Sequence, residues 1–270
     1  MFIPVELQRG SSEIDWCEHN YAILPGIAEF FNTISNVLFF LLPPMLIHLF
    51  RQYAQQVNKG INIIWILLVV VGVCSAYFHA TLSLVGQLLD ELAILWVIMW
   101  STAMFFPRRY YPAIFNGNRT IFKVAVVTLS IFSTVLAFLH PAVNHLVMIC
   151  FVLPSAFLLV TEMRRCDCDR VYRLGRLCGI YTTIAVTVWM SDQVNCNFWS
   201  ALKFPYLHSI WHIMIFEGAY LGCVLFAYFD AVVEVPEQGP MLKYWPDDTW
   251  ELVGVPYISF KTVAGKATNC

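Results

Sequence analysis

The chain has 270 residues, of which 59% are hydrophobic and 13% are charged, and its formal net charge is −2. A soluble domain usually carries about 25% charged residues, so this composition excludes an ordinary water-soluble fold. The near-neutral net charge provides no basic field, and we expect no nucleic-acid partner. The composition therefore predicts a protein embedded in a lipid bilayer.

Seven apolar runs are long enough to cross a membrane, which takes about 20 residues in a helix. They cover residues 29–50, 61–82, 86–106, 122–140, 142–162, 176–195 and 205–229. The predicted fold is all-α, a bundle of seven transmembrane helices. Residues 1–28 would form an N-terminal segment, residues 29–232 the membrane-spanning bundle, and residues 233–270 a C-terminal tail.

The basic residues are unevenly divided between the two ends of these runs. Eleven of the 16 Lys and Arg residues lie around the loops after the first, third and fifth runs, and three more follow the seventh run on that same side. Only Arg9 and Lys203 fall on the opposite side. Cytosolic loops are enriched in Lys and Arg, so we expect a lumenal or extracellular N-terminus and a cytosolic C-terminus.

Three histidines fall at one predicted depth near the lumenal ends of the runs. His79 lies near the end of the second run, whereas His208 and His212 share one helix face because they are four residues apart. Ser75 lies one turn deeper than His79, and Asp90 lies near the start of the third run. Three imidazoles suit zinc with an open fourth position. Asp90 could act on a zinc-activated water, and Ser75 could donate to an oxyanion.

A simpler interpretation exists for each of these histidines taken alone. A single histidine in a membrane helix usually forms a hydrogen bond to a neighbouring helix, and pairs of histidines four residues apart arise by chance. The shared depth of His79, His208 and His212 follows from topology without any assumption about function. That coincidence favours the zinc interpretation.

Acidic and amide side chains form a second cluster before and at the start of the first run. Asp15, Glu18 and Asn20 offer oxygen ligands, the type that calcium prefers. Spacing alone fits a solvated acidic segment better. Glu29 favours a cation site instead, because an unpaired carboxylate at the start of an apolar run is costly.

Two of the nine cysteines, Cys17 and Cys196, fall on the predicted lumenal side. A disulfide can form and persist in that compartment. The spacing leaves open whether these two residues pair.

With these residues in view, the sequence resembles the alkaline ceramidases, membrane amidases of the superfamily that includes the adiponectin and progestin receptors. The matching stretches are residues 13–18, 28–36, 77–83, 87–91 and 206–212. Residues 106–110 and 236–240 are most similar to a family member of the Golgi membrane. The resemblance therefore implies a multi-pass protein of the Golgi membrane, with the endoplasmic reticulum as the alternative.

The resemblance also implies a reaction, hydrolysis of the ceramide amide to sphingosine and a free fatty acid. Ceramide and membrane lipids would be the partners, and we expect no obligate protein partner. Zinc would bind His79, His208 and His212, with Asp90 and Ser75 as the catalytic residues. The resemblance further implies a Cys17–Cys196 disulfide and a supporting calcium ion, whose ligands would be Asp15, the Trp16 carbonyl, Glu18, Asn20 and Glu29.

Two other functions fit parts of this pattern. A receptor of the same superfamily would keep the metal residues with a structural zinc, but the predicted lumenal N-terminus disfavours the adiponectin-receptor branch. A metal transporter would need polar residues across the whole bilayer, and the second run below Ser75 is made of Val and Leu. The hydrolase is the function that the sequence favours.

Overall fold

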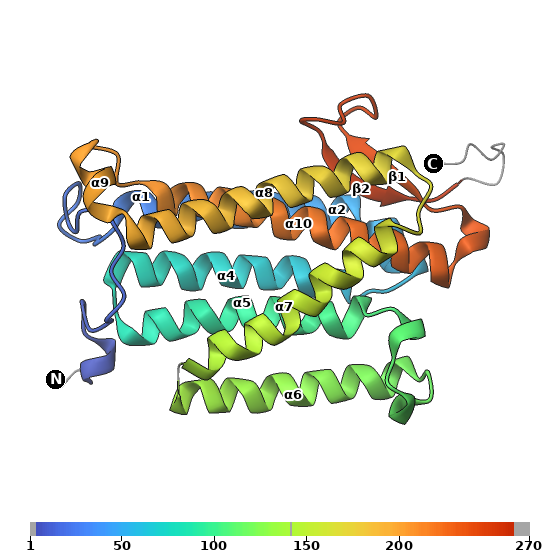
Figure 1. The fold of residues 1–270 in the computed structure, drawn as a ribbon, viewed down its shortest axis with the longest axis horizontal. Helices are drawn as coiled ribbons and strands as arrows, with labels where there is room; N and C mark the ends of the chain where they lie inside the picture. The colour runs from blue at the N-terminus through green and yellow to red at the C-terminus, as the bar shows by residue number, and fades with distance from the viewer. Residues whose placement is uncertain (1–3, 141, 262–270) are drawn as a thin grey trace. The chain divides into compact units, whose positions relative to one another are not determined.

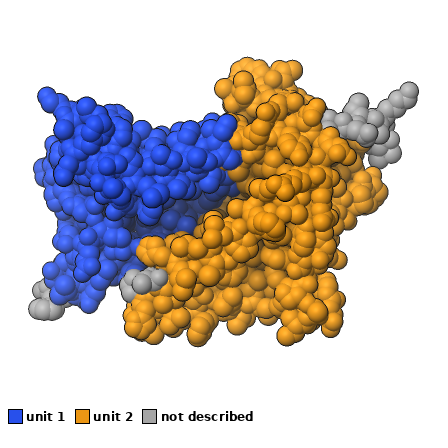
Figure 2. Space-filling model, in the orientation of Figure 1, with its two compact units in different colours: residues 1–42, 67–94, 179–219 blue, residues 43–66, 95–178, 220–270 orange. Residues whose placement is uncertain are grey.

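The computed structural model describes residues 4–140 and 142–261, and most of these residues are helical. The chain divides into two compact units, drawn in blue and orange in Figure 2. Unit 1 comprises residues 1–42, 67–94 and 179–219, and unit 2 comprises residues 43–66, 95–178 and 220–270. Each unit gathers segments that are far apart in the sequence.

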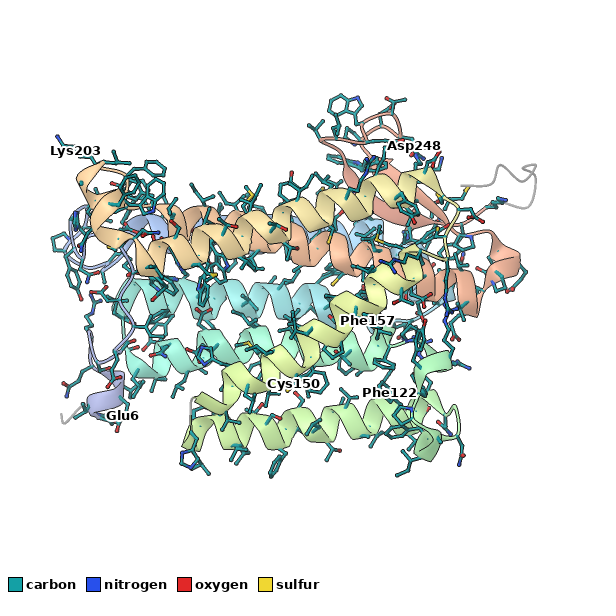
Figure 3. The ribbon with its side chains drawn as sticks, viewed as in Figure 1. Glu6, Phe122, Cys150, Phe157, Lys203 and Asp248 are labelled. Carbon is teal, nitrogen blue, oxygen red and sulfur yellow. A yellow bond between two sulfur atoms is a disulfide. The ribbon has the colours of Figure 1, made fainter. Side chains whose placement is uncertain are left out.

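Six helical segments are long and apolar enough to cross a membrane. They are Phe30–Leu49, Ile61–Thr81 (α4), Leu84–Phe105 (α5), Arg119–Leu139 (α6), Val143–Met163 in α7 (Ala142–Met163) and Leu207–Glu234 (α10). The first consists of α1 (Phe30–Ile34), the 3-10 turn η2 (Ser35–Val37) and α2 (Leu38–Leu49) (Figure 1). Apolar side chains project freely from α7, and Phe157 is 71% exposed (Figure 3). These helices indicate that the chain is an integral membrane protein.

The sixth predicted run lies in α8 (Asp169–Val194), which is long enough to span but less apolar than the other six segments. Its first turns carry Arg170, Arg173 and Arg176, and Asp192 lies near its end. These charges lower its mean hydropathy. A seventh crossing, and with it the orientation of the two termini, stays a prediction.

The turn between α4 and α5 falls two residues earlier than the sequence predicts. Leu82 has a left-handed backbone, with φ of 47°, and α5 begins at Leu84. The Ser83 hydroxyl accepts a hydrogen bond from the Gly86 amide at 3.1 Å, which caps the new helix. A Cβ at Gly86 would lie 3.0 Å from the Phe78 Cα, so glycine permits the close approach of the two helices in unit 1.

The C-terminal tail contains an antiparallel hairpin that the all-α prediction missed. Strand β1 (Met241–Trp245) pairs with β2 (Val255–Ser259), and the buried and partly exposed residues alternate along both. Arg170 of α8 donates to the Leu242 carbonyl and to Glu251, so the hairpin is held against α8 within unit 2. Hydrogen bonds from Arg173 and Arg170 lower the pKa of the Glu251 carboxyl.

Short helices complete the described part of the chain. They are η1 (Val5–Leu7), α3 (Arg51–Gln56), η3 (Arg108–Tyr110), η4 (Ala113–Phe115), α9 (Cys196–Ala201) and η5 (Pro236–Gln238). Pro43 and Pro44 lie inside α2, at the point in the chain where unit 1 ends and unit 2 begins. Proline removes a backbone donor inside a helix and commonly bends it.

Cys17 and Cys196 form a disulfide, which confirms the predicted pairing. It ties the N-terminal segment to the start of α9 within unit 1, across a sequence separation of 179 residues. The Cys17 amide also donates to the Asp192 carboxylate at 3.2 Å. The N-terminal segment is therefore attached to α8 and α9 by a covalent bond and a buried hydrogen bond.

We predict that Cys17→Ser lowers the free energy of unfolding by about 2–4 kcal/mol, the usual contribution of a native disulfide. The measurement is the midpoint of thermal unfolding in detergent. Cys150→Ser is the matched control, because Cys150 is an exposed free thiol on α7 (Figure 3). Equal midpoints for the two variants would contradict a stabilising role of the disulfide.

Candidate metal centre and active site

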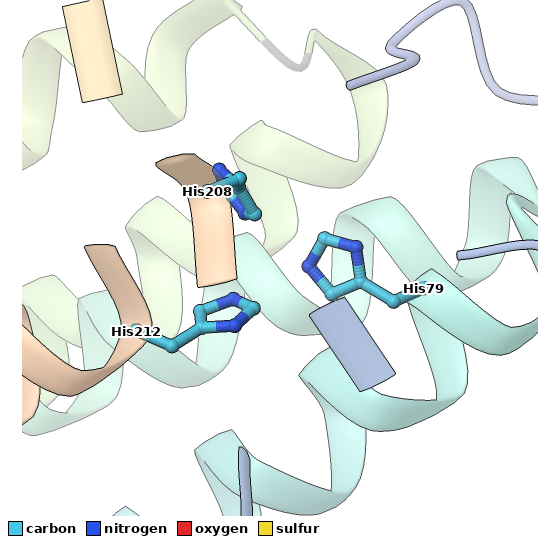
Figure 4. A group of neighbouring side chains, drawn as sticks. All are labelled: His79, His208 and His212. Carbon is cyan, nitrogen blue, oxygen red and sulfur yellow. The ribbon is translucent and has the colours of Figure 1, made fainter. Parts of the chain in front are cut away.

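Three buried histidines converge in unit 1 (Figure 4). Their candidate ligand atoms all lie within 4.8 Å of one another. His79 is 0% exposed, and His208 and His212 are each 2% exposed. The structure thus brings together the three histidines that the sequence singled out.

Local structure explains this convergence. His79 occupies the last turn of α4, and His208 and His212 lie one turn apart at the start of α10. Side chains four residues apart lie on the same face of a helix, so both histidines of α10 face His79. The ring centroids of His79 lie 4.9 Å from those of both His208 and His212.

Unpartnered ring nitrogens indicate that these residues fit a metal. Nε2 of His79 and Nδ1 of His208 are buried and have no hydrogen-bond partner. A buried polar atom without a partner is costly. Three neutral imidazoles are also the donor set of a catalytic zinc site with one open position, so zinc is consistent with the donors present.

The Glu29 carboxylate accepts a hydrogen bond from Nδ1 of His79 at 2.5 Å, and both side chains are fully buried. A proton on Nδ1 leaves the lone pair on Nε2, the nitrogen that has no partner. Histidines that bind metals usually donate their other ring N–H to a carboxylate in this way. Glu29 therefore orients His79, a role that the sequence did not predict for it.

Ser35 plays the equivalent role for His212. Its hydroxyl donates to the Asn32 carbonyl at 2.9 Å, so its oxygen accepts from Nδ1 of His212 at 2.7 Å. This arrangement leaves the lone pair of His212 on Nε2. Asn32 also accepts a hydrogen bond from Ser209 through its side-chain oxygen, at 2.7 Å, which joins α1 to α10 within unit 1.

Of the two predicted catalytic residues, Ser75 lies beside the histidines and Asp90 lies next to Ser75. The Ser75 hydroxyl is 3.4 Å from Nε2 of His212 and also interacts with the Asp90 carboxylate. Ser75 is buried, whereas Asp90 is half-buried. A hydroxyl beside three candidate metal ligands, with a carboxylate next to that hydroxyl, suits general acid–base chemistry.

The N-terminal segment covers one side of the histidines. The ring of Trp16 stacks on that of His208, with the centroids 3.6 Å apart and the planes inclined by 24°. The Trp16 amide donates to Glu29 at 3.0 Å. The carboxylate of Asp192 is buried and faces the backbone amide of His208 as well as that of Cys17.

The predicted calcium ligands lie near one another, but several of them have other partners. Asp15 accepts hydrogen bonds from the Asn20 amide at 3.0 and 3.1 Å, and its carboxylate also interacts with that of Glu29. Two adjacent carboxylates repel each other unless a proton or a cation lies between them. This pair is the feature of the segment that favours a cation.

Glu18 has a structural role of its own. Its carboxylate accepts hydrogen bonds from the backbone amides of Phe31 and Asn32, at 2.6 and 2.8 Å, in the first turn of α1. Burial, together with the nearby Glu29 carboxylate, raises the pKa of Glu18 although these hydrogen bonds lower it. Through the two backbone hydrogen bonds, Glu18 caps the start of α1.

Sequence reasoning did not find the supporting residues Asn32, Ser35 and Ser209. All three are small polar residues within or beside apolar runs: Asn32 contacts Glu29, Ser35 contacts His212, and Ser209 contacts Asn32. Their types are common in helix-pairing positions of membrane proteins. The sequence therefore held no signal that separates them from other such residues.

The chain is similar to known proteins over most of its length. The chain matches the Ceramidase family over residues 8–259. It is 49% identical to the "Alkaline ceramidase" of Drosophila melanogaster over 261 residues, 97% of this chain and 92% of that protein. It is 39% identical to the "Alkaline ceramidase 1" of Homo sapiens over 251 residues, 93% of this chain and 95% of that protein.

A more distant relative is the "Alkaline ceramidase" of Caenorhabditis elegans, which is 30% identical over 252 residues, 91% of this chain and 92% of that protein. The matched region includes every residue of the histidine cluster and its supporting contacts. The resemblance inferred from the sequence motifs is confirmed, and the chain belongs to the Ceramidase family.

Proposed function

We propose that this protein is a zinc-dependent, membrane-embedded amidase that hydrolyses ceramide to sphingosine and a free fatty acid. The observation that carries the proposal is the buried cluster of His79, His208 and His212, with unpartnered ring nitrogens, in a member of the Ceramidase family. His79, His208 and His212 would hold the zinc. When bound, zinc would polarise a carbonyl and lower the pKa of a water molecule.

The chain's own residues would then guide the proton. In hydrolysis the water adds its oxygen to the amide carbon, the carbon–nitrogen bond breaks, and the nitrogen gains a proton. The half-buried Asp90 carboxylate would take a proton from the water and deliver it to the departing amine. The Ser75 hydroxyl, which contacts Asp90, would donate a hydrogen bond to the developing oxyanion.

The membrane setting suits a lipid substrate. Six helices are long and apolar enough to lie in the bilayer, so ceramide could enter laterally from the membrane. We propose that α8 forms a seventh crossing, with residues 1–28 lumenal and residues 233–270 cytosolic. The Golgi membrane is the proposed location, because residues 106–110 and 236–240 are similar to a Golgi member of the family.

A calcium ion is proposed to support the zinc site indirectly. Asp15, the Trp16 carbonyl, Glu18, Asn20 and Glu29 would be its ligands. The close approach of the Asp15 and Glu29 carboxylates supports this assignment. Because Glu29 also accepts the hydrogen bond from His79, calcium would affect the histidine cluster through that side chain.

The alternative function is that of a receptor of the adiponectin and progestin receptor superfamily, in which the zinc would be structural. It would share the three histidines, so the metal residues cannot separate the two functions. Membership of the Ceramidase family favours the hydrolase. Activity and bound metal must therefore be measured together.

We expect His208→Ala to reduce ceramide hydrolysis by more than about 100-fold and to reduce bound zinc, because removal of one ligand leaves two donors. Sphingosine release and zinc by elemental analysis are the two readouts. His145→Ala is the matched control, since His145 is exposed at the start of α7. Unchanged sphingosine release in His208→Ala would rule out the zinc-hydrolase mechanism.

Asp90→Asn should lower kcat by about 100- to 10,000-fold, the usual contribution of a general acid–base residue. The same variant should keep its zinc, because Asp90 is not one of the three ligands. Glu91→Gln is the control that neutralises the adjacent carboxylate, and we expect it to stay within a few-fold of wild type. Zinc loss in Asp90→Asn would instead make Asp90 a ligand.

Asp15→Ala is expected to weaken the activation of ceramide hydrolysis by calcium while bound zinc stays unchanged. Removal of this carboxylate deletes a calcium ligand without touching the histidines. The measurement is sphingosine release across a calcium titration, with zinc by elemental analysis. Glu13→Ala, an exposed acid of the same segment, is the control. Loss of zinc in Asp15→Ala would contradict a separate calcium site.

A further inference from the structure

A basic groove lies at the junction of α2, α3 and α4 within unit 2. Its volume is about 390 Å³, which falls in the range of small-molecule sites, about 300–1,000 Å³. The lining residues are Pro44, Ile47, His48, Arg51, Ala54, Gln55, Lys59 and Asn62. Three of them are basic or can become so, and none is acidic.

The positive charge of this groove is uncompensated. Arg51 and Lys59 are exposed, and neither takes part in an ion pair among the described residues. Two like charges that face one groove without a counter-ion repel each other and attract an anion. The groove therefore calls for a negatively charged ligand.

A second cavity of unit 2 provides the contrast. It is lined by three arginines and three acids, Arg108, Arg109, Arg119, Glu162, Asp230 and Glu234. Every one of these side chains is paired within the set. That cavity is electrically balanced by its own residues, so it has no comparable need for an anion.

Polar and apolar groups complete the groove. The side-chain oxygen of Asn62 is buried and has no hydrogen-bond partner, so it offers an acceptor to a ligand hydroxyl. Gln55 adds a second amide. Pro44 and Ile47 lie on the side of the groove formed by α2 and present apolar surface next to the charges.

We propose that this groove binds the headgroup of an anionic, hydroxyl-bearing phospholipid such as a phosphorylated inositol lipid. Arg51 and Lys59 would contact phosphate, Asn62 would accept from a headgroup hydroxyl, and the apolar side would meet the glycerol and upper acyl chains. In the proposed orientation this end of α2 and α4 is cytosolic. Basic pockets between membrane helices on that side bind anionic lipid headgroups.

The test is native mass spectrometry of the full chain in non-ionic detergent, titrated with phosphatidylinositol monophosphate. Wild type is expected to bind one lipid, and Arg51→Gln with Lys59→Gln to bind about 30-fold more weakly, as loss of two cations predicts. Arg51→Lys conserves the charge and should retain binding. Phosphatidylcholine should bind no more weakly to the double variant than to wild type.

Arg164→Gln with Arg176→Gln is the matched control, because it removes two exposed cations from the same predicted side outside the groove. Equal weakening in the control and in the groove variant would overturn the proposal in favour of general surface charge. Tight binding of free inositol phosphate, equal to that of the lipid, would overturn the lipid as the source. The readout is binding alone, so its failure is distinguishable from failure of the proposed ceramidase activity.

Discussion

The hydrogen bond between Glu29 and His79 is the interaction on which the candidate site depends. It joins the start of α1 to the last turn of α4 at 2.5 Å, between two side chains that are fully buried. A carboxylate and an imidazole that lie out of water without partners would each be costly. Together they satisfy each other and set which nitrogen of His79 is free. The histidine cluster is thus prepared by a residue 50 positions away in the sequence.

The N-terminal segment acts as part of the site rather than as an appendage. The Trp16 ring stacks on His208, and the Trp16 amide donates a hydrogen bond to Glu29. Cys17 forms a disulfide with Cys196, and its amide donates a hydrogen bond to Asp192. Each contact replaces solvent around a buried polar group with a fixed partner. Because Glu29 also lies next to Asp15, any cation bound to this segment would change the surroundings of His79.

The charged residues of unit 2 lie outside the candidate site, and many of them form ion pairs with one another. Most of its arginines are paired with acids, including Arg119 with Asp230 and Glu234, and Arg170 with Glu251. Arg51 and Lys59 are among the cations with no ion pair in the described part of the chain, and both line one groove. Positive charge near a bilayer surface serves topology as well as binding. The groove is distinguished by the absence of lining acids and by the buried oxygen of Asn62.

The sequence by itself determined the membrane class, six of the spans and the three histidines, because apolar length and helical spacing are local properties. It also placed Asp90 at about the depth of His79, and Ser75 one turn deeper. Tertiary structure decided what local patterns do not record: Glu29 and Ser35 orient the histidines, and Glu18 caps α1. The hairpin of the tail depends on Arg170 of another segment. Hydrogen bonds between distant segments have no sequence period, so only the folded chain reveals them.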